Sequence, residues 1–200
     1  MRQTARGTLL VLLLTFSLSA HYLINDHLIS PKAGEVIERI GSELQQKTGI
    51  HAYVIASNDR LEKRANLYTY VKKYEKSLSK PWVAILFLPN NKRLGILVSG
   101  PDLQKAYDDS RVKKYAVDIL GSADSNSQQS KYDVAMVQAY SELADELAAA
   151  KGAELTQTIK NEGQWIVKVI TWLVYLGAVL VFWVYFGRPI YMRIRHGKQQ

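Results

Sequence analysis

The sequence predicts an α/β fold, in which a small mixed β-sheet is covered by helices on both faces and is followed by one C-terminal transmembrane helix. Three observations lead to this prediction. Between residues 30 and 88, segments with helical periodicity alternate with short apolar runs. Two apolar runs in the middle of the chain are separated by a turn sequence, which is typical of an antiparallel hairpin. Residues 169–187 carry no charged side chain and match the length that a helix needs to cross a bilayer.

The first helix is predicted to begin at Pro31 and to end before Gly49. Ser30 is a favourable N-cap, proline fits the first helical position, and glycine is favourable just after the last turn. Apolar residues recur at helical spacing between these limits, at Val36, Ile37, Ile40 and Leu44. The run HAYVIAS at residues 51–57 is rich in strand formers and predicts a strand directly after the helix.

The middle of the chain predicts a helix and a β-hairpin. Residues 61–78 form an amphipathic pattern with lysines on the polar side, which predicts a second helix. The run PWVAILFL at 81–88 predicts a central strand and LGILVS at 94–99 its partner. Only residues 89–93, among them the turn formers Pro89 to Lys92, separate the two runs. An antiparallel pairing is therefore expected, because a parallel one needs a longer crossover.

The second half of the domain is predicted to be helical. A short helix or turn at 102–109 precedes a helix at 110–120, a polar loop at 121–130 and a long last helix at 131–151. Together these elements predict one domain at residues 25–151. A linker at 152–164 then leads to the transmembrane helix, whose aromatic flanks extend it to 165–187.

Both ends of the chain carry membrane signals. Residues 1–19 predict a signal peptide, with Ser17 and Ser19 as the small residues before a cleavage point; the alternative is an uncleaved anchor at residues 8–24. The tail at 188–200 is basic and holds no acidic residue, so the positive-inside rule predicts a cytoplasmic C-terminus. The domain is therefore expected in the periplasm, held at the bacterial inner (cytoplasmic) membrane.

The distribution of charge and the absence of cysteine exclude several classes of function. The formal net charge is +8, yet residues 21–160 hold nineteen Lys or Arg against seventeen Asp or Glu, so the excess lies mostly at the membrane flanks. This balance gives no reason to expect a nucleic-acid partner. Because the chain has no cysteine, disulfides, iron–sulfur clusters and thiolate zinc sites are excluded.

Two segments resemble a known family, the TPM domains. Asp26, Ser30-Pro31 and Lys47-Thr48-Gly49 match the early Asp, the Leu-Ser-Pro helix start and the Lys-Thr-Gly helix end of that family. Residues 93–120 are similar to its second hairpin strand, Gly-rich turn and helix-opening Asp, with Gly100 and Asp109 at the matching places. The resemblance covers about residues 24–151 and implies an α/β/α fold.

The same resemblance bears on function. TPM domains occur in thylakoid-lumen photosystem-repair proteins and in bacterial envelope proteins, often with a signal peptide and a following transmembrane helix. Some members are described as acid phosphatases with a divalent cation near their carboxylates. The sequence differs from the family pattern in two loops, at Pro81-Trp82 and at Asp102.

Four carboxylates form the candidate site, and all lie at predicted element ends where loops converge: Asp26, Asp102, Asp108 and Asp109. Carboxylate oxygens suit Ca²⁺ or Mg²⁺, and such a cation can hold a phosphate for attack by water. Ca²⁺ binding through Asp26 and Asp109 is the specific prediction. The alternative is that Asp102 and Asp109 favour a turn and a helix N-terminus.

The sequence contains no motif for other kinds of catalysis or ligand binding. His27 and His51 are solitary, with no short ligand spacing, and no G-x-S-x-G, P-loop or dinucleotide fingerprint occurs. The first functional hypothesis is therefore a membrane-anchored, extracytoplasmic TPM-like module that binds membrane proteins and supports the assembly or maintenance of a membrane-protein complex. The second is a divalent-cation-assisted acid phosphatase that uses the aspartates. No catalytic residue is assigned.

Overall fold

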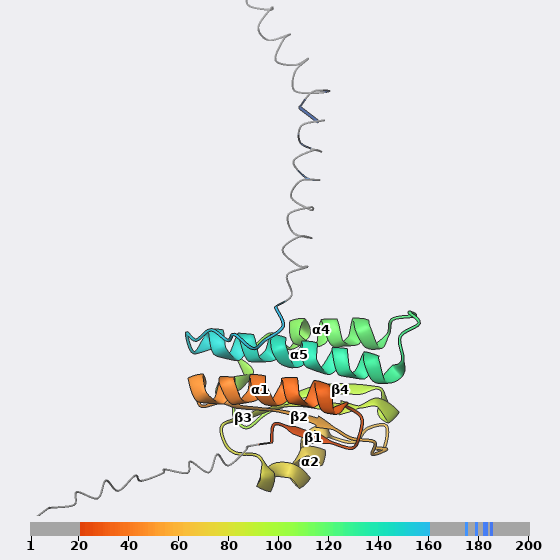
Figure 1. Ribbon diagram of the computed structural model, residues 1–200, viewed down its shortest axis with the longest axis vertical. Coiled ribbons are helices and arrows are strands. Elements are labelled where there is room, and N and C mark those ends of the chain that lie inside the picture. The colour runs from red at the N-terminus through yellow and green to blue at the C-terminus, as the bar shows by residue number, and fades with distance from the viewer. Residues whose placement is uncertain (1–20, 161–174, 176–178, 180–181, 184, 186–200) are drawn as a thin grey trace, which may run out of the picture. The chain divides into compact units, whose positions relative to one another are not determined.

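The computed structural model describes residues 21–160 and five further positions, 175, 179, 182, 183 and 185 (Figure 1). The predicted signal peptide and basic tail, and nearly all of the predicted transmembrane helix, lie outside the described residues. Among the described residues, no helix is both long and apolar enough to cross a membrane. The chain divides into two compact units, one ending at Thr158 and the other beginning at Ile159.

A four-stranded mixed sheet forms the centre of the first unit. Its strands are β1 (Leu23–Asn25), β2 (His51–Ala56), β3 (Trp82–Leu88) and β4 (Arg93–Val98), in the order β1-β2-β3-β4. The first three strands run parallel, and β3 pairs with β4 antiparallel. The α/β class and the hairpin are thus confirmed. Strand β1 is an addition, because three residues are too few to show an alternating pattern.

Helix α1 (Pro31–Thr48) connects β1 to β2 and follows the predicted boundaries. The Ser30 side chain accepts a hydrogen bond from the Ala33 amide, and Gly49 ends the helix with a φ of 72°. A left-handed conformation of this kind carries little cost for glycine, which has no Cβ. The capping residues therefore fixed both ends.

The predicted helix at 61–78 is wrong in its extent. A short helix α2 (Leu67–Val71) continues into a 3-10 helix η1 (Lys72–Ser77), and residues 61–66 are not helical. The Asn91 side chain accepts a hydrogen bond from the Leu61 amide and donates one to the Leu61 carbonyl. Asn66 then caps α2 by accepting a bond from the Tyr68 amide. These side chains use backbone groups that a longer helix would need.

The remaining elements follow the hairpin. A 3-10 turn η2 (Pro89–Asn91) joins β3 to β4, and α3 (Pro101–Gln104) precedes α4 (Asp109–Leu120) and α5 (Gln128–Ala150). Helix α5 begins three residues before the predicted start, because the Ser127 side chain accepts a hydrogen bond from the Ser130 amide and acts as its N-cap. The predicted polar loop is correspondingly shorter.

The two faces of the sheet are covered unequally (Figure 1). Helices α1, α4 and α5 cover one face, with α5 packed against both of the others. On this face the rings of Phe87 in β3 and Tyr132 in α5 are in contact, with centroids 4.9 Å apart. Gly95 lies on the opposite face, because it pairs with Leu86 and successive strand residues point to opposite sides. There a Cβ added at Gly95 would lie 2.8 Å from the Leu67 side chain of α2.

Candidate functional site: an ionic cleft and a fixed C-terminal segment

Asp26 lies at the carboxyl end of β1 and is held by residues that follow β2. Its carboxylate accepts hydrogen bonds from the Ser57 hydroxyl at 2.8 Å and the Asn58 amide at 3.1 Å. The Asn58 side chain also donates to the Asp26 carbonyl. Asp26 therefore ties the ends of two parallel strands together.

The other three predicted site residues lie beyond the opposite end of the sheet. Strand β4 runs antiparallel to β3, so its last residue, Val98, pairs with Val83 near the start of β3. Asp102, Asp108 and Asp109 follow β4 in α3 and at the start of α4. Asp26 and the other three aspartates therefore lie at opposite ends of the sheet, and a metal site built from them stays a prediction. The directions of the strands, which the sequence left open, determine this separation.

Each of Asp108 and Asp109 has a local partner. The Asp108 carboxylate caps α4 by accepting hydrogen bonds from the Ser110 and Arg111 amides, and Asp109 pairs with Lys113 one helical turn later. Within residues 21–160 no group of three or more His, Asp or Glu side chains is arranged to hold a metal ion. Binding of Ca²⁺ or Mg²⁺ stays a prediction.

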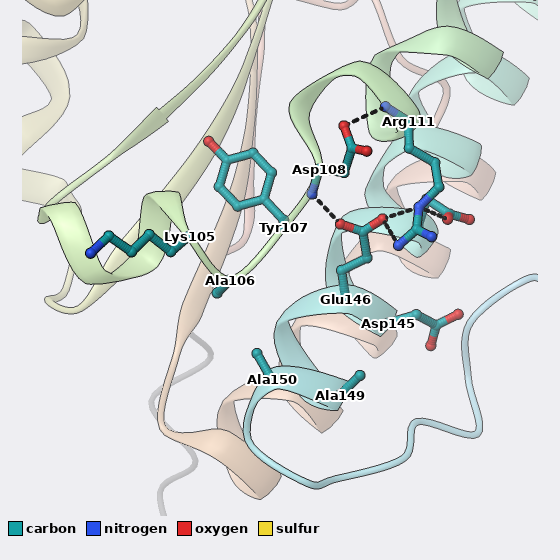
Figure 2. Close-up of a pocket in the computed structure, with 10 residues that line it drawn as sticks. Lys105, Ala106, Tyr107, Asp108, Arg111, Asp145, Glu146, Ala149 and Ala150 are labelled. Atoms are coloured by element: carbon teal, nitrogen blue, oxygen red, sulfur yellow. Dashed lines mark hydrogen bonds and ion pairs between the residues drawn. The ribbon is translucent and has the colours of Figure 1, made fainter.

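An open cleft of about 650 Å³ lies where the loop before α4 meets the C-terminal half of α5 (Figure 2). The loop contributes Lys105, Tyr107 and Asp108, and α5 contributes a series of carboxylates. Glu146 lies between the two elements. Its carboxylate accepts a hydrogen bond from the Asp108 amide at 2.5 Å and pairs with the Arg111 guanidinium, as the dashed lines in Figure 2 mark.

Arg111 joins two carboxylates of α5. Its Nε lies 3.3 Å from a Glu142 oxygen and donates a hydrogen bond at 2.5 Å to the Glu146 oxygen that also pairs with Nη2. The Glu146 side chain is 8% exposed and that of Arg111 is 54% exposed, so the pair lies at the edge of the cleft. The hydrogen bond to Glu146 raises the pKa of Arg111, and burial raises the pKa of Glu142.

The side chains of this cleft hold the start of α4 against α5. Burial raises the pKa of Tyr107 to about 12, so its hydroxyl stays protonated near neutral pH and is a poor nucleophile. The buried carboxylate of Glu146 is compensated by a guanidinium and a backbone amide. The arrangement fixes the start of α4 against α5 and leaves a charged opening beside it.

A second cluster fixes the segment after α5. The Glu43 carboxylate of α1 accepts hydrogen bonds from the Thr156 amide, the Thr156 hydroxyl and the Gln157 amide, all at 2.9 to 3.0 Å. Lys47 bridges Glu43 and the Glu154 carbonyl, with both distances at 2.7 Å. The first part of the predicted linker is thus attached to the domain.

The attachment has an apolar and an electrostatic component. Leu155 is 3% exposed and packs in the main core. Desolvation raises the pKa of Glu43, but the hydrogen bonds from Lys47, Gln157 and Thr156 outweigh it and lower the pKa to about 2. On α5, Asp145 accepts a hydrogen bond from the Thr158 hydroxyl at 2.8 Å.

Sequence reasoning did not identify Glu43, Arg111 or Glu146. Glu43 and Glu146 occur on amphipathic helices, where an acidic residue usually faces solvent. Their binding partners are distant in sequence, so no local pattern marks them. A usable signal existed for Glu146 alone, because it lies on the side of α5 that carries the buried Leu143 and Leu147. A carboxylate in such a position usually has a specific partner.

No family model matches the chain, and a search of curated proteins found no match.

Proposed function

We propose that this protein is a membrane-anchored, extracytoplasmic TPM-like module that binds membrane proteins and supports the assembly or maintenance of their complex. In this proposal residues 1–19 direct export, the domain has the α/β/α architecture of the TPM family, and residues 165–187 anchor it in the bacterial inner membrane. The domain lies in the periplasm and the tail at 188–200 lies in the cytoplasm.

The observation that carries the proposal is the attachment of residues 153–158 to the domain. Glu43, Lys47 and Asp145 hold this segment by hydrogen bonds from two different helices. The chain therefore leaves the domain from a defined place, only a few residues before the apolar stretch. A domain that includes the segment leading to the predicted anchor suits a tethered binding module.

The roles of the aspartates also favour a binding module over a phosphatase. Asp26 connects two strand ends, Asp108 caps a helix and Asp109 pairs with Lys113. Each of these three carboxylates thus has a structural role. A cation-assisted phosphatase needs carboxylates that converge on one ion.

The topology is tested by protease treatment of intact spheroplasts that carry the full chain. We expect digestion of residues 25–160 and protection of the final dozen residues. Digestion of the tail with protection of the domain would contradict the proposal.

The function is tested by deleting the gene and separating membrane complexes on native gels. We expect at least one complex to decrease, and the wild-type chain to restore it. Unchanged complexes, together with phosphate release from a generic ester at acidic pH that Asp109→Ala abolishes, would instead favour the enzyme.

A further inference from the structure

The segment from Arg60 to Lys80, which includes α2 and η1, is much more basic than the rest of the domain. Seven of its residues are Lys or Arg and two are Glu, whereas the other residues between 21 and 160 hold twelve Lys or Arg and fifteen Asp or Glu. The near-neutral total therefore conceals a polarised domain. The basic side is the one that α2 covers, opposite α1, α4 and α5 (Figure 1).

A groove of about 170 Å³ lies in this basic side, between α2, η1 and the sheet end where β3 begins and β4 ends. Its apolar side chains come from Val71 and Trp82, which are 2% and 6% exposed. Tyr68 also lines it and is 52% exposed, an unusual position for a large aromatic side chain. The groove thus combines a buried apolar floor with an accessible aromatic ring.

Charges surround this floor. Lys72 and Lys80 line the groove and are both exposed. Glu75 is the acidic residue among the lining side chains, and it pairs with Lys80 at 3.7 Å. Both partners of that pair are at least half exposed, so a competing carboxylate displaces it at little cost.

Trp82 supplies a donor that the fold does not use. Its indole nitrogen is buried, and no acceptor in the described part of the chain bonds to it. The Trp82 backbone amide, by contrast, donates to the Ser99 hydroxyl at 2.9 Å. Leaving such a buried N–H unpaired costs roughly 1–3 kcal/mol.

We propose that this groove binds an acidic peptide segment that inserts one apolar side chain. The apolar side chain would lie on Val71 and Trp82, and the acidic side chains would meet Lys72 and Lys80. The inference deepens the proposed function and rests on it for the nature of the partner, which would be an exported segment of a membrane protein.

A lipid surface fits these observations less well. The groove is concave and holds room for a side chain, whereas a flat array of headgroups needs only the exposed lysines. The segment 153–158, from which the chain continues, is attached to α1 and α5 on the other side of the sheet.

The test uses the full chain in nonionic micelles with ¹⁵N-labelled tryptophan. The Trp82 indole signal is assigned by its loss in Trp82→Phe. The probe is the blocked hexapeptide Glu-Glu-Leu-Leu-Glu-Glu, and the controls are the same peptide with Lys for Glu or with Ser for Leu. We expect a saturable shift of the Trp82 signal with the probe alone.

Matched charge reversals locate the site. Lys72→Glu should weaken binding about tenfold or more, whereas Lys32→Glu, the same change on an exposed residue of α1, should alter it less than about twofold. Equal effects of the two variants, or an equal response to the lysine peptide, would overturn the proposal. A response to phosphatidylglycerol in the micelles without a response to the probe would also overturn it, in favour of a lipid.

The two proposals fail separately. If gene deletion removes a membrane complex and the probe leaves Trp82 unaffected, the module stands and this groove is not its binding site. If the probe binds and no complex depends on the gene, the groove stands and the assembly function is wrong.

Discussion

The two faces of the sheet use different means to stay covered. On one face, α1 and α5 contribute six and eleven buried residues, whereas on the other α2 contributes Val71 and η1 contributes none. The first face is a packed helical layer, while the second is a thin cover with many basic side chains. Most of the packing thus lies on the side opposite the proposed binding groove, so that changes around the groove should cost little folding free energy.

Side-chain truncation should give the largest contrast between the faces. Leu143 of α5 is fully buried, and Leu143→Ala should lower the free energy of unfolding by about 3–4 kcal/mol through lost burial and a cavity. Leu67→Ala on α2, where the side chain is only partly buried, should lower it by about 1 kcal/mol. Denaturant unfolding in nonionic micelles measures both, and equal losses would remove the distinction.

Glycine-to-alanine substitutions should show the same difference in stability between the two faces. A Cβ at Gly41 would meet the Tyr140 hydroxyl and the Tyr22 ring at about 2.5 Å, and all three residues are buried. Gly41→Ala should therefore cost about 2–3 kcal/mol. Gly95→Ala meets only the end of the flexible Leu67 side chain, so its cost should be smaller. The thermal unfolding temperatures of the two variants test this order. A larger loss of stability in Gly95→Ala than in Gly41→Ala would contradict it.

Acidic pH should lower the stability of the domain mainly through the face covered by α1, α4 and α5. The folded-state pKa of Glu43 is about 2 against an ordinary value of 4.5, so its contribution is complete above about pH 4.5 and is lost as the pH falls toward 2. We expect a loss of about 2 kcal/mol over this range. Stability measured against pH should become flatter in Glu43→Gln.

Asp59 on the α2 side provides the control. A hydrogen bond from Lys73 lowers its pKa too, but the carboxylate is exposed and solvent weakens the effect. Asp59→Asn should leave the pH profile almost unchanged. A steeper dependence on Asp59 than on Glu43 would reverse the assignment.

Two buried hydroxyls give the smallest expected difference. Tyr140 donates to the Ala52 carbonyl at 2.8 Å inside the helical side, and Tyr140→Phe should cost about 1 kcal/mol. Tyr53 accepts from the Ser79 amide at 3.1 Å on the other side, where Ser79 is exposed to water. Tyr53→Phe should therefore lower the free energy of unfolding by less than Tyr140→Phe. The denaturant midpoints of both variants measure this difference.

Local signals predicted the elements that depend on nearby residues. Ser30 and Gly49 set the limits of α1, and the turn at 89–92 predicted the hairpin, because capping and turn chemistry act within a few residues. The helix predicted at 61–78 failed because Asn91, thirty residues away, binds the backbone of Leu61. An amphipathic pattern carries no information about such a competitor.

The candidate site depended on long-range geometry and was predicted less well. Asp26 and Asp109 both lie at element ends, but at opposite ends of the sheet, and only the strand directions reveal this. Glu43 and Thr156 are 113 residues apart in sequence, so no local pattern connects them. Pairing across such separations is a property of the tertiary fold.

The hydrogen bonds from Thr156 and Gln157 to Glu43 affect how the domain responds to a pulling force. Tension applied to the chain beyond Thr158 reaches α1 through these bonds and α5 through Asp145, instead of peeling α5 from its last residue. Several bonds then bear the force together. A domain attached in this way resists being pulled open from its C-terminal end.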